Sequence, residues 1–278
     1  MTIFNPDGIR EISVFDDIQR PAPELCDALR KIGSATAAGE LFNLGVTRPH
    51  MAGLTAWRKG KAIAGPALTL QCMPKRQDVT DSKEYGERGI LHHLVMYPTQ
   101  PGDIIVVDAR GEMEGGIFGE MMMTYFQRRG GAGVVIDGCL RDWPDMEDLD
   151  VGIWMRGVSP NHGMQNNLMF WGVNVPIACA NVLVIPGDII VADGDGAICV
   201  PVKLAPEVIR RANEKKDWEA FTRLKLREGH DMRKYYPLSE EAKIEYEAWR
   251  SASKAKSRGA KGQSASAPAR RRAPRPNR

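Results

Sequence analysis

The chain has 278 residues, 43% of them hydrophobic, so it can bury a sizeable core. No stretch approaches the eighteen or more uncharged apolar residues of a membrane span, and the polar, acidic opening is unlike a signal peptide, so we expect a cytoplasmic protein. The net charge is +3, but residues 251–278 carry nine basic and no acidic side chains, which leaves 29 basic and 35 acidic residues elsewhere. An acidic body argues against an enzyme of nucleic acids.

The predicted elements alternate between helices and strands. Residues 23–44 have helical spacing of Leu and Ile, although Gly33 and Gly39 weaken the middle and predict a split. Runs rich in Val and Ile predict strands at 62–71, 104–107, 134–136, 189–192 and 197–200. Helical patterns lie at about 85–96, 119–129 and 206–228. Several strands are apolar on both faces, as in a covered sheet, and the mixture indicates an α/β protein.

One sequence segment recurs. Residues 101–108, Pro-Gly-Asp-Ile-Ile-Val-Val-Asp, return at 186–193 as Pro-Gly-Asp-Ile-Ile-Val-Ala-Asp. In each copy Pro-Gly-Asp predicts a turn, the apolar residues predict a strand, and an aspartate ends it. We interpret the copies as two similar turn-strand units of one sheet, with a catalytic role for Asp108 or Asp193 as the alternative.

The last 28 residues consist mainly of Ser, Ala, Pro, Gly and cations, a composition typical of disorder. A solvated appendage is one interpretation of this tail, and weak, salt-sensitive contact with RNA or an acidic partner is the other. We therefore expect an N-terminal extension at 1–22, a main domain at 23–235, a helical extension at 236–250 and a disordered basic tail at 251–278.

The segment 115–145 carries the chemistry. It predicts a glycine-rich loop, a helix that opens near Gly119, a buried strand at 134–136, and a loop with Arg141, Asp142 and Asp145. The first amides of such a helix, from Gly119 to Met122, are free and form a natural anion site. Arginine binds a carboxylate through two parallel hydrogen bonds, so Arg141 and these amides suit the carboxylate of a 2-oxo acid.

Asp142 can offer an oxygen to a hard cation such as Mg²⁺ or Mn²⁺, while Glu120 and Asp145 hold its waters. The same residues also suit a plain helix start, with Asp142 as the N-cap, Pro144 in the first turn and Asp145 at the third position. Arg141 would then pair with a surface acid. Spacing alone leaves both interpretations open.

The motif resembles the signature of the RraA-like family: Gly119-Glu120, twenty residues, then Arg141-Asp142-x-x-Asp145 within the frame G-V-V-I-D-G-C-L-R-D. The runs at 62–70 and 186–201 and the helix that includes Ser34 fit the family in order, so the resemblance covers about residues 25–230. It implies an α/β fold with a layered β/β/α, swivelling-domain-like core and flanking helices. It also implies a homo-oligomer, either a homotrimer or a homohexamer, with the site at a subunit interface.

The resemblance implies an aldolase of the 4-hydroxy-4-methyl-2-oxoglutarate/4-carboxy-4-hydroxy-2-oxoadipate type. This is a divalent-metal-dependent lyase that cleaves a 4-hydroxy-2-oxo acid to pyruvate and a second carbonyl compound, with oxaloacetate decarboxylation as a side activity. By the resemblance, Arg141 binds the substrate carboxylate, Asp142 ligates Mg²⁺ (or Mn²⁺ or Co²⁺) directly, and Glu120 and Asp145 act through water. Substrate also contacts the backbone of Gly119, Glu120, Met121 and Met122.

The resemblance adds a glutamate from a neighbouring subunit's C-terminal helix, for which Glu219 is the nearest counterpart, although spacing points closer to Asp217. Family members with aldolase activity carry an acid at the position of Asp145, which the RNase E regulators that name the family tend to lack. Two alternatives stay open: a protein inhibitor of an RNase E-like endonuclease, and a lyase or dehydratase for a sugar-derived 2-keto acid.

The remaining reactive side chains favour structural roles. Five widely spaced cysteines without a C-x-x-C predict buried thiols, with a catalytic Cys139 as the alternative. His50, His92, His93 and His162 lack zinc-site spacing, so we expect polar or buried structural roles, with contact of His162 to a distal substrate carboxylate as the alternative.

Overall fold

The computed structural model describes residues 17–81, 91–163 and 167–264. The chain forms two compact units, residues 1–212 and 213–278, and this division falls inside the range 23–235 expected for the main domain. No helix among the described residues is both long enough and apolar enough to cross a membrane.

The first unit is built on a mixed sheet with the strand order β1-β5-β4-β3-β2-β9-β10, in which β6 also pairs with β2. Strands β2 to β5 run parallel, whereas β1, β6, β9 and β10 are antiparallel to their neighbours. The strands of this sheet are β1 (Thr55–Ala56), β2 (Ile63–Pro74), β3 (Ile104–Asp108), β4 (Gly133–Leu140), β5 (Gly152–Val158), β6 (Leu168–Val173), β9 (Ile189–Asp193) and β10 (Gly196–Val200).

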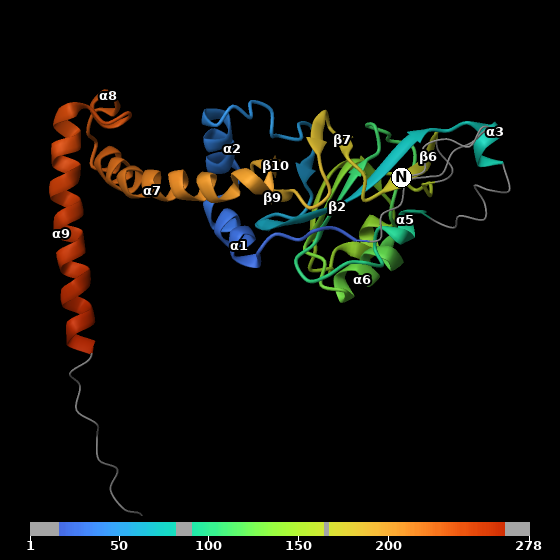
Figure 1. Ribbon diagram of the computed structural model, residues 1–278, viewed down its shortest axis with the longest axis horizontal. Coiled ribbons are helices and arrows are strands. Elements are labelled where there is room, and N and C mark those ends of the chain that lie inside the picture. Colours follow the sequence, from blue (N-terminus) through green and yellow to red (C-terminus); the bar gives the residue numbers. More distant parts are fainter. Residues whose placement is uncertain (1–16, 82–90, 164–166, 265–278) are drawn as a thin grey trace, which may run out of the picture. The chain divides into compact units, whose positions relative to one another are not determined.

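The alternation of side chains along β3 separates the interior into two layers. Ile105 and Val107 pack on one face with residues of α5 (Leu91–Leu94) and α6 (Glu120–Arg128), while Ile104 and Val106 pack on the other with the hairpin β7 (Ile177–Cys179)–β8 (Val182–Val184). Figure 1 shows this hairpin and α6 on opposite sides of the sheet. The expected layered β/β/α core with flanking helices is therefore confirmed.

A third packing group covers β9 and β10. It joins α1 (Pro23–Ile32), α2 (Ser34–Asn43) and the start of α7 (Ala205–Arg227), which follows η2 (Val202–Leu204). The predicted split of the first helical stretch is confirmed at Gly33, whose φ of +85° favours glycine. The main-chain amide and the hydroxyl of Ser34 donate to the Asp193 carboxylate at 2.7 and 2.6 Å, so Asp193 anchors the start of α2.

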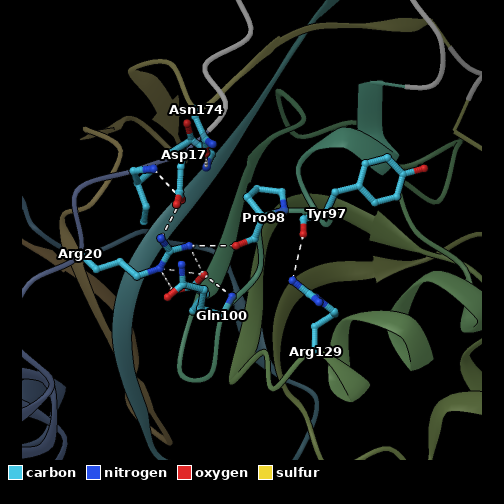
Figure 2. A network of polar contacts seen from close by, with 10 residues as sticks. Asp17, Arg20, Tyr97, Pro98, Gln100, Arg129 and Asn174 are labelled. Carbon is cyan, nitrogen blue, oxygen red and sulfur yellow. Dashed lines mark hydrogen bonds and ion pairs between the residues drawn. The ribbon is translucent and has the colours of Figure 1, made fainter.

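The recurring segment forms two turn-strand units, which end in β3 and β9. In both turns the aspartate of Pro-Gly-Asp accepts from the amide three residues earlier, Gln100 to Asp103 at 2.8 Å and Ile185 to Asp188 at 3.0 Å. Arg20 also binds the buried Asp103 carboxylate through Nε at 2.9 Å and Nη2 at 2.7 Å (Figure 2). These contacts tie the segment before α1 to the turn that leads into β3.

The second unit contains the rest of α7, then α8 (Met232–Tyr235) and α9 (Glu240–Ser264). Phe221, Tyr235 and Ala242 form its small core, and the hydroxyl of Thr222 donates to the Tyr235 carbonyl at 2.9 Å. The helix α9 continues to Ser264, beyond the boundary at Arg250 expected from composition, through a stretch rich in the helix formers Ala and Lys. Residues 265–278 of the expected tail lie outside the described part of the chain.

Most of the predicted elements are present, with differences in extent. The helices expected at 119–129 and 206–228 are α6 and α7, and the five expected strands are β2, β3, β4, β9 and β10. The helix expected at 85–96 is described only as α5, because residues 82–90 lie outside the described part. The short helix α3 (Gln77–Thr80) and strands β1 and β5 to β8 were not predicted, whereas the short helix η1 (Trp143–Met146) begins where the helix-start interpretation placed a helix.

Candidate functional site

A β-α-β unit brings the two halves of the sequence motif together. The chain passes from β3 through α6 to β4, and β3 and β4 are parallel neighbours. The carboxyl ends of both strands and the N-terminus of α6 therefore meet at one edge of the sheet, where ligands of α/β proteins usually bind. Arg141 and Asp142 directly follow β4 at this edge.

The glycine-rich loop before α6 packs against the end of β4. The amide of Ile117 donates to the Cys139 carbonyl at 2.8 Å, and that of Arg141 donates to the Phe118 carbonyl at 3.1 Å. A Cβ atom on Gly116 would lie 2.5 Å from the Arg141 nitrogen, and one on Gly119 would lie 2.6 Å from Oδ2 of Asp142. The close approach of loop and strand end requires glycine at 116, where the neighbour is backbone, whereas a Cβ at 119 would displace the side chains of Asp142 and Arg141.

Arg141 and Asp142 lie side by side at the start of α6. Nε of Arg141 is 3.2 Å from Oδ2 of Asp142, and the two side chains are 39% and 38% exposed, so both remain accessible to a ligand. The Glu120 amide points at the same Oδ2 at 3.4 Å, a long contact. This group combines a guanidinium, a carboxylate and the positive end of a helix within a few ångströms.

The backbone of Asp142 explains why its side chain faces this group. With φ of 58° and ψ of 34°, it is left-handed, a conformation that aspartate adopts more readily than most residues. Asp142 occupies the N-cap position of η1, but its carboxylate accepts no capping hydrogen bond there. The position matches the plain helix-start interpretation, whereas the side-chain contacts do not.

A cavity of about 390 Å³ opens beside these two residues. It is lined by glycines, apolar side chains and three imidazoles, together with the charged side chains of Arg141 and Asp142. The lining residues are His92, His93, Gly116, Ile117, Gly119, Met121, Met122, Arg141, Asp142, His162 and Gly163. The structure thus places Gly119, Met121, Met122, Arg141 and Asp142 of the predicted site around one space.

Three histidines line the cavity: His162, for which substrate contact was predicted only as an alternative, and His92 and His93, for which structural roles were predicted. His92 stacks on Phe170 with ring centroids 4.3 Å apart and meets His93 edge-on at 4.6 Å. Burial, and then the nearby His93 and His162, lower the pKa of His92 to about 3, so it is neutral at physiological pH. Nδ1 of His92 is buried and has no hydrogen-bond partner within the described part of the chain. His162 and His93 are 69 positions apart in the sequence, so spacing gave no signal for this group.

Three predicted carboxylates, those of Glu120, Asp145 and Glu219, are not part of the described lining of the cavity. The carboxylate of Glu120 accepts from the hydroxyl of its own helix neighbour Thr124 at 2.7 Å. Asp145 is exposed in η1, and its amide donates to the Asp142 carbonyl at 3.1 Å. Glu219 belongs to the second unit, where Nζ of Lys215 lies 3.4 Å from its carboxylate. The roles proposed for these three carboxylates remain predictions.

The donor set suits a hydrated hard cation. Among the described residues, no group of three or more His, Cys, Asp and Glu side chains could hold a metal ion, so a site of the structural zinc type has no support there. Magnesium behaves differently, because it keeps several waters and takes one or two carboxylates in addition to substrate oxygens. Asp142, accessible and on the cavity wall, fits that requirement.

Other candidate residues from the sequence lie in the interior. All five cysteines are buried, as predicted, and burial raises the pKa of Cys139. Burial also raises the pKa of Asp108, which accepts a hydrogen bond from the Arg110 amide at 3.2 Å. A catalytic role for Asp108 or Cys139 finds no support in these surroundings.

Comparison with known proteins identifies the family of the chain. The family model described as "RraA-like: Aldolase/RraA" matches residues 22–199. Several curated relatives carry the name "Putative 4-hydroxy-4-methyl-2-oxoglutarate aldolase". The one from Halalkalibacterium halodurans is 35% identical over 43% of this chain and 56% of its own length. The one from Xanthomonas campestris pv. campestris (strain B100) is 28% identical over 67% of this chain and 95% of its own.

A solved structure adds a relative with a different described role. Streptomyces coelicolor RraAS2, described as an unusual member of the RNase ES inhibitor RraA protein family, superimposes with a TM-score of 0.67 at 41% identity. The match covers 74% of this chain and 98% of RraAS2. Relatives of this chain thus carry both an enzyme name and an inhibitor description.

Proposed function

The chain belongs to the RraA-like family, and from that premise we propose that it is a pyruvate-releasing carbon–carbon lyase that acts on a 4-hydroxy-2-oxo acid. The observation that carries the proposal is the pairing of Arg141 with Asp142 on the wall of a cavity at the start of α6. The aldolase name of two relatives supports the same reaction class.

Arg141 and the amides at the start of α6 hold the carboxylate of the pyruvoyl unit. A guanidinium meets a carboxylate with two parallel hydrogen bonds, and the amides of Met121 and Met122 add the positive end of the helix dipole. Binding at this end orients the bond between C3 and C4 within the cavity. Orientation of this kind contributes much of the rate enhancement of an enzyme.

Asp142 would hold the divalent cation, with Glu120 and Asp145 acting through water. When bound, Mg²⁺ supplies Lewis-acid polarisation of the 2-oxo group. Water oriented by the carboxylates of Glu120 and Asp145 accepts the C4 hydroxyl proton as the bond between C3 and C4 breaks, and a proton returns to C3. The products are pyruvate and the carbonyl compound formed from C4. Oxaloacetate would lose CO₂ by cleavage of the same bond, with no proton removed at C4 and one taken up at C3 from water.

The test measures pyruvate release from a 4-hydroxy-2-oxo acid and from oxaloacetate, with Mg²⁺ and with EDTA. We expect activity that EDTA abolishes and Mg²⁺ restores. We also expect Arg141→Ala to lower kcat/KM about 100-fold or more, because two charge-assisted hydrogen bonds are lost. Arg141→Lys keeps the charge without the paired geometry and should recover only part of the loss, while Arg30→Ala removes an exposed arginine of α1 as the control. Equal rates with Mg²⁺ and EDTA would reject the mechanism.

A second candidate function is inhibition of an RNase E-like endonuclease. The 41% identity to RraAS2 favours it. The same Arg141→Ala variant separates the two functions, because a contact inhibitor does not need a cavity arginine. Loss of pyruvate release with unchanged folding supports the lyase, whereas endonuclease inhibition by a wild-type protein that releases no pyruvate supports the inhibitor.

A further inference from the structure

The cavity beside Arg141 adjoins a second hollow. This hollow has a volume of about 250 Å³, and His93, Met121 and Met122 line both spaces. The rest of its lining comes from the turn after α5 and from α6, namely Met96, Tyr97 and Tyr125. A ligand held at Arg141 can therefore extend past His93 into the second hollow.

The walls of the second hollow are apolar and unusually exposed. Met121 is 81% exposed, Tyr97 53% and Tyr125 41%, and the two tyrosine rings meet edge to face with centroids 6.2 Å apart. Exposed apolar patches of this kind are found at binding sites more often than on the rest of a protein surface. Their continuity with the cavity indicates that the occupant is part of the ligand bound there.

Among the described residues, the hollow offers no cation to a second carboxylate. Its described lining contains no Lys or Arg. The nearby Arg129 directs its guanidinium to the Tyr97 carbonyl at 3.4 Å, and in Figure 2 the Tyr97 ring extends away from it. Burial lowers the pKa of His93, the imidazole shared by both spaces, which favours its neutral form. Arg141 is the sole Lys or Arg in the described lining of the cavity itself, and the pyruvoyl carboxylate occupies it.

We propose that the hollow lined by Tyr97 and Tyr125 binds the part of the substrate beyond C4, and that this part is uncharged and apolar. The preferred substrate is then a 4-hydroxy-2-oxo monocarboxylate with an alkyl or aryl substituent, not a diacid. The inference rests on the proposed function, because that function assigns the first carboxylate to Arg141.

The test compares binding of three stable 2-oxo acids by calorimetry in the presence of Mg²⁺, independently of turnover. They are 2-oxobutanoate, 2-oxohexanoate, and 2-oxoadipate, which replaces the terminal methyl of 2-oxohexanoate with a carboxylate. Each buried methylene strengthens binding about 3- to 4-fold, so we expect 2-oxohexanoate to bind roughly 10-fold more tightly than 2-oxobutanoate. We expect it to exceed 2-oxoadipate by at least about 10-fold, because the described lining gives a carboxylate no cation to replace its lost hydration.

Variants locate the effect. Tyr125→Ala should reduce the 2-oxohexanoate to 2-oxobutanoate affinity ratio to near one, whereas Phe42→Ala, which removes an exposed aromatic ring of α2, should leave the ratio unchanged. Tyr125→Lys should raise affinity for 2-oxoadipate. These shifts would support the proposal even if no substrate released pyruvate, a result that would reject only the lyase.

Three results would overturn the proposal. The first is tighter binding of 2-oxoadipate that His162→Asn abolishes, which would place a distal carboxylate at His162. The second is an unchanged 2-oxohexanoate to 2-oxobutanoate affinity ratio in Tyr125→Ala, together with a change in the oligomeric mass of this variant in solution. That result would make the hollow a contact between copies of the chain. The third is the absence of binding by all three acids.

Discussion

The contact of Gly119 with the charged pair gives the sharpest prediction about the site. In Gly119→Ala the new Cβ would lie 2.6 Å from Oδ2 of Asp142 and 2.9 Å from Nε of Arg141, whereas ordinary contact begins at 3.4 Å. Asp142 must therefore move by about 0.8 Å or the helix start must shift. A displacement near 1 Å costs roughly 100-fold in rate, or about 2.7 kcal/mol of transition-state stabilisation.

The same substitution should change stability little. Gly119 has φ of −111°, which alanine adopts without strain, and alanine for glycine at an N-cap costs less than about 1 kcal/mol. The assay pairs kcat/KM for pyruvate release from oxaloacetate with the midpoint of thermal unfolding. Gly39→Ala is the control, since an added Cβ there meets nothing within 4 Å and should stabilise α2 by about 0.5–1 kcal/mol at full activity. A folded Gly119→Ala protein with wild-type activity would refute the assignment of Arg141 and Asp142.

Three further predictions concern stability. Arg20→Ala should lower the free energy of unfolding, measured in urea, by about 3 kcal/mol, because it leaves the buried Asp103 carboxylate with the Gln100 amide as its remaining described donor. A loss below about 1 kcal/mol would contradict this. Asp193→Asn should cost about 2 kcal/mol through weakened hydrogen bonds to Ser34, with activity per folded molecule retained; loss of activity at full folding would instead make Asp193 catalytic. The folded-state pKa of His92, about 3, lies below its usual value, so between these two values the unfolded chain binds more protons than the folded chain, and stability rises with pH. The free energy of unfolding should therefore be about 2 kcal/mol higher at pH 8 than at pH 5. His92→Gln should remove this difference.

The sequence predicted the elements with strong local signals. The glycine at 33 marked the break between α1 and α2, and the recurrence of Pro-Gly-Asp marked the turns before β3 and β9. It also placed Arg141 near the start of α6, because a strand that follows a helix in a β-α-β unit ends beside that helix's N-terminus. Local periodicity and turn chemistry carry this information without any knowledge of distant contacts.

The features that were not predicted depend on distant contacts. Strand β5, with Trp154 and Arg156, lacks a long Val and Ile run and is defined by pairing with β4. The approach of His162 to His92 follows from the loop after β5 meeting the glycine loop at Gly116, a pairing between distant segments. The left-handed conformation of Asp142, which prevents ordinary capping by its side chain, is equally invisible in the residue order. Site geometry therefore required the structure even where the residues were identified correctly.

A crystal structure with Mn²⁺ and pyruvate tests the central claim most directly. The account predicts an anomalous scattering peak within coordination distance, about 2.2 Å, of a carboxylate oxygen of Asp142. It also predicts the pyruvate carboxylate at about 2.7–2.9 Å from the guanidinium of Arg141. Manganese bound only at other carboxylates, or pyruvate bound away from Arg141, would contradict it.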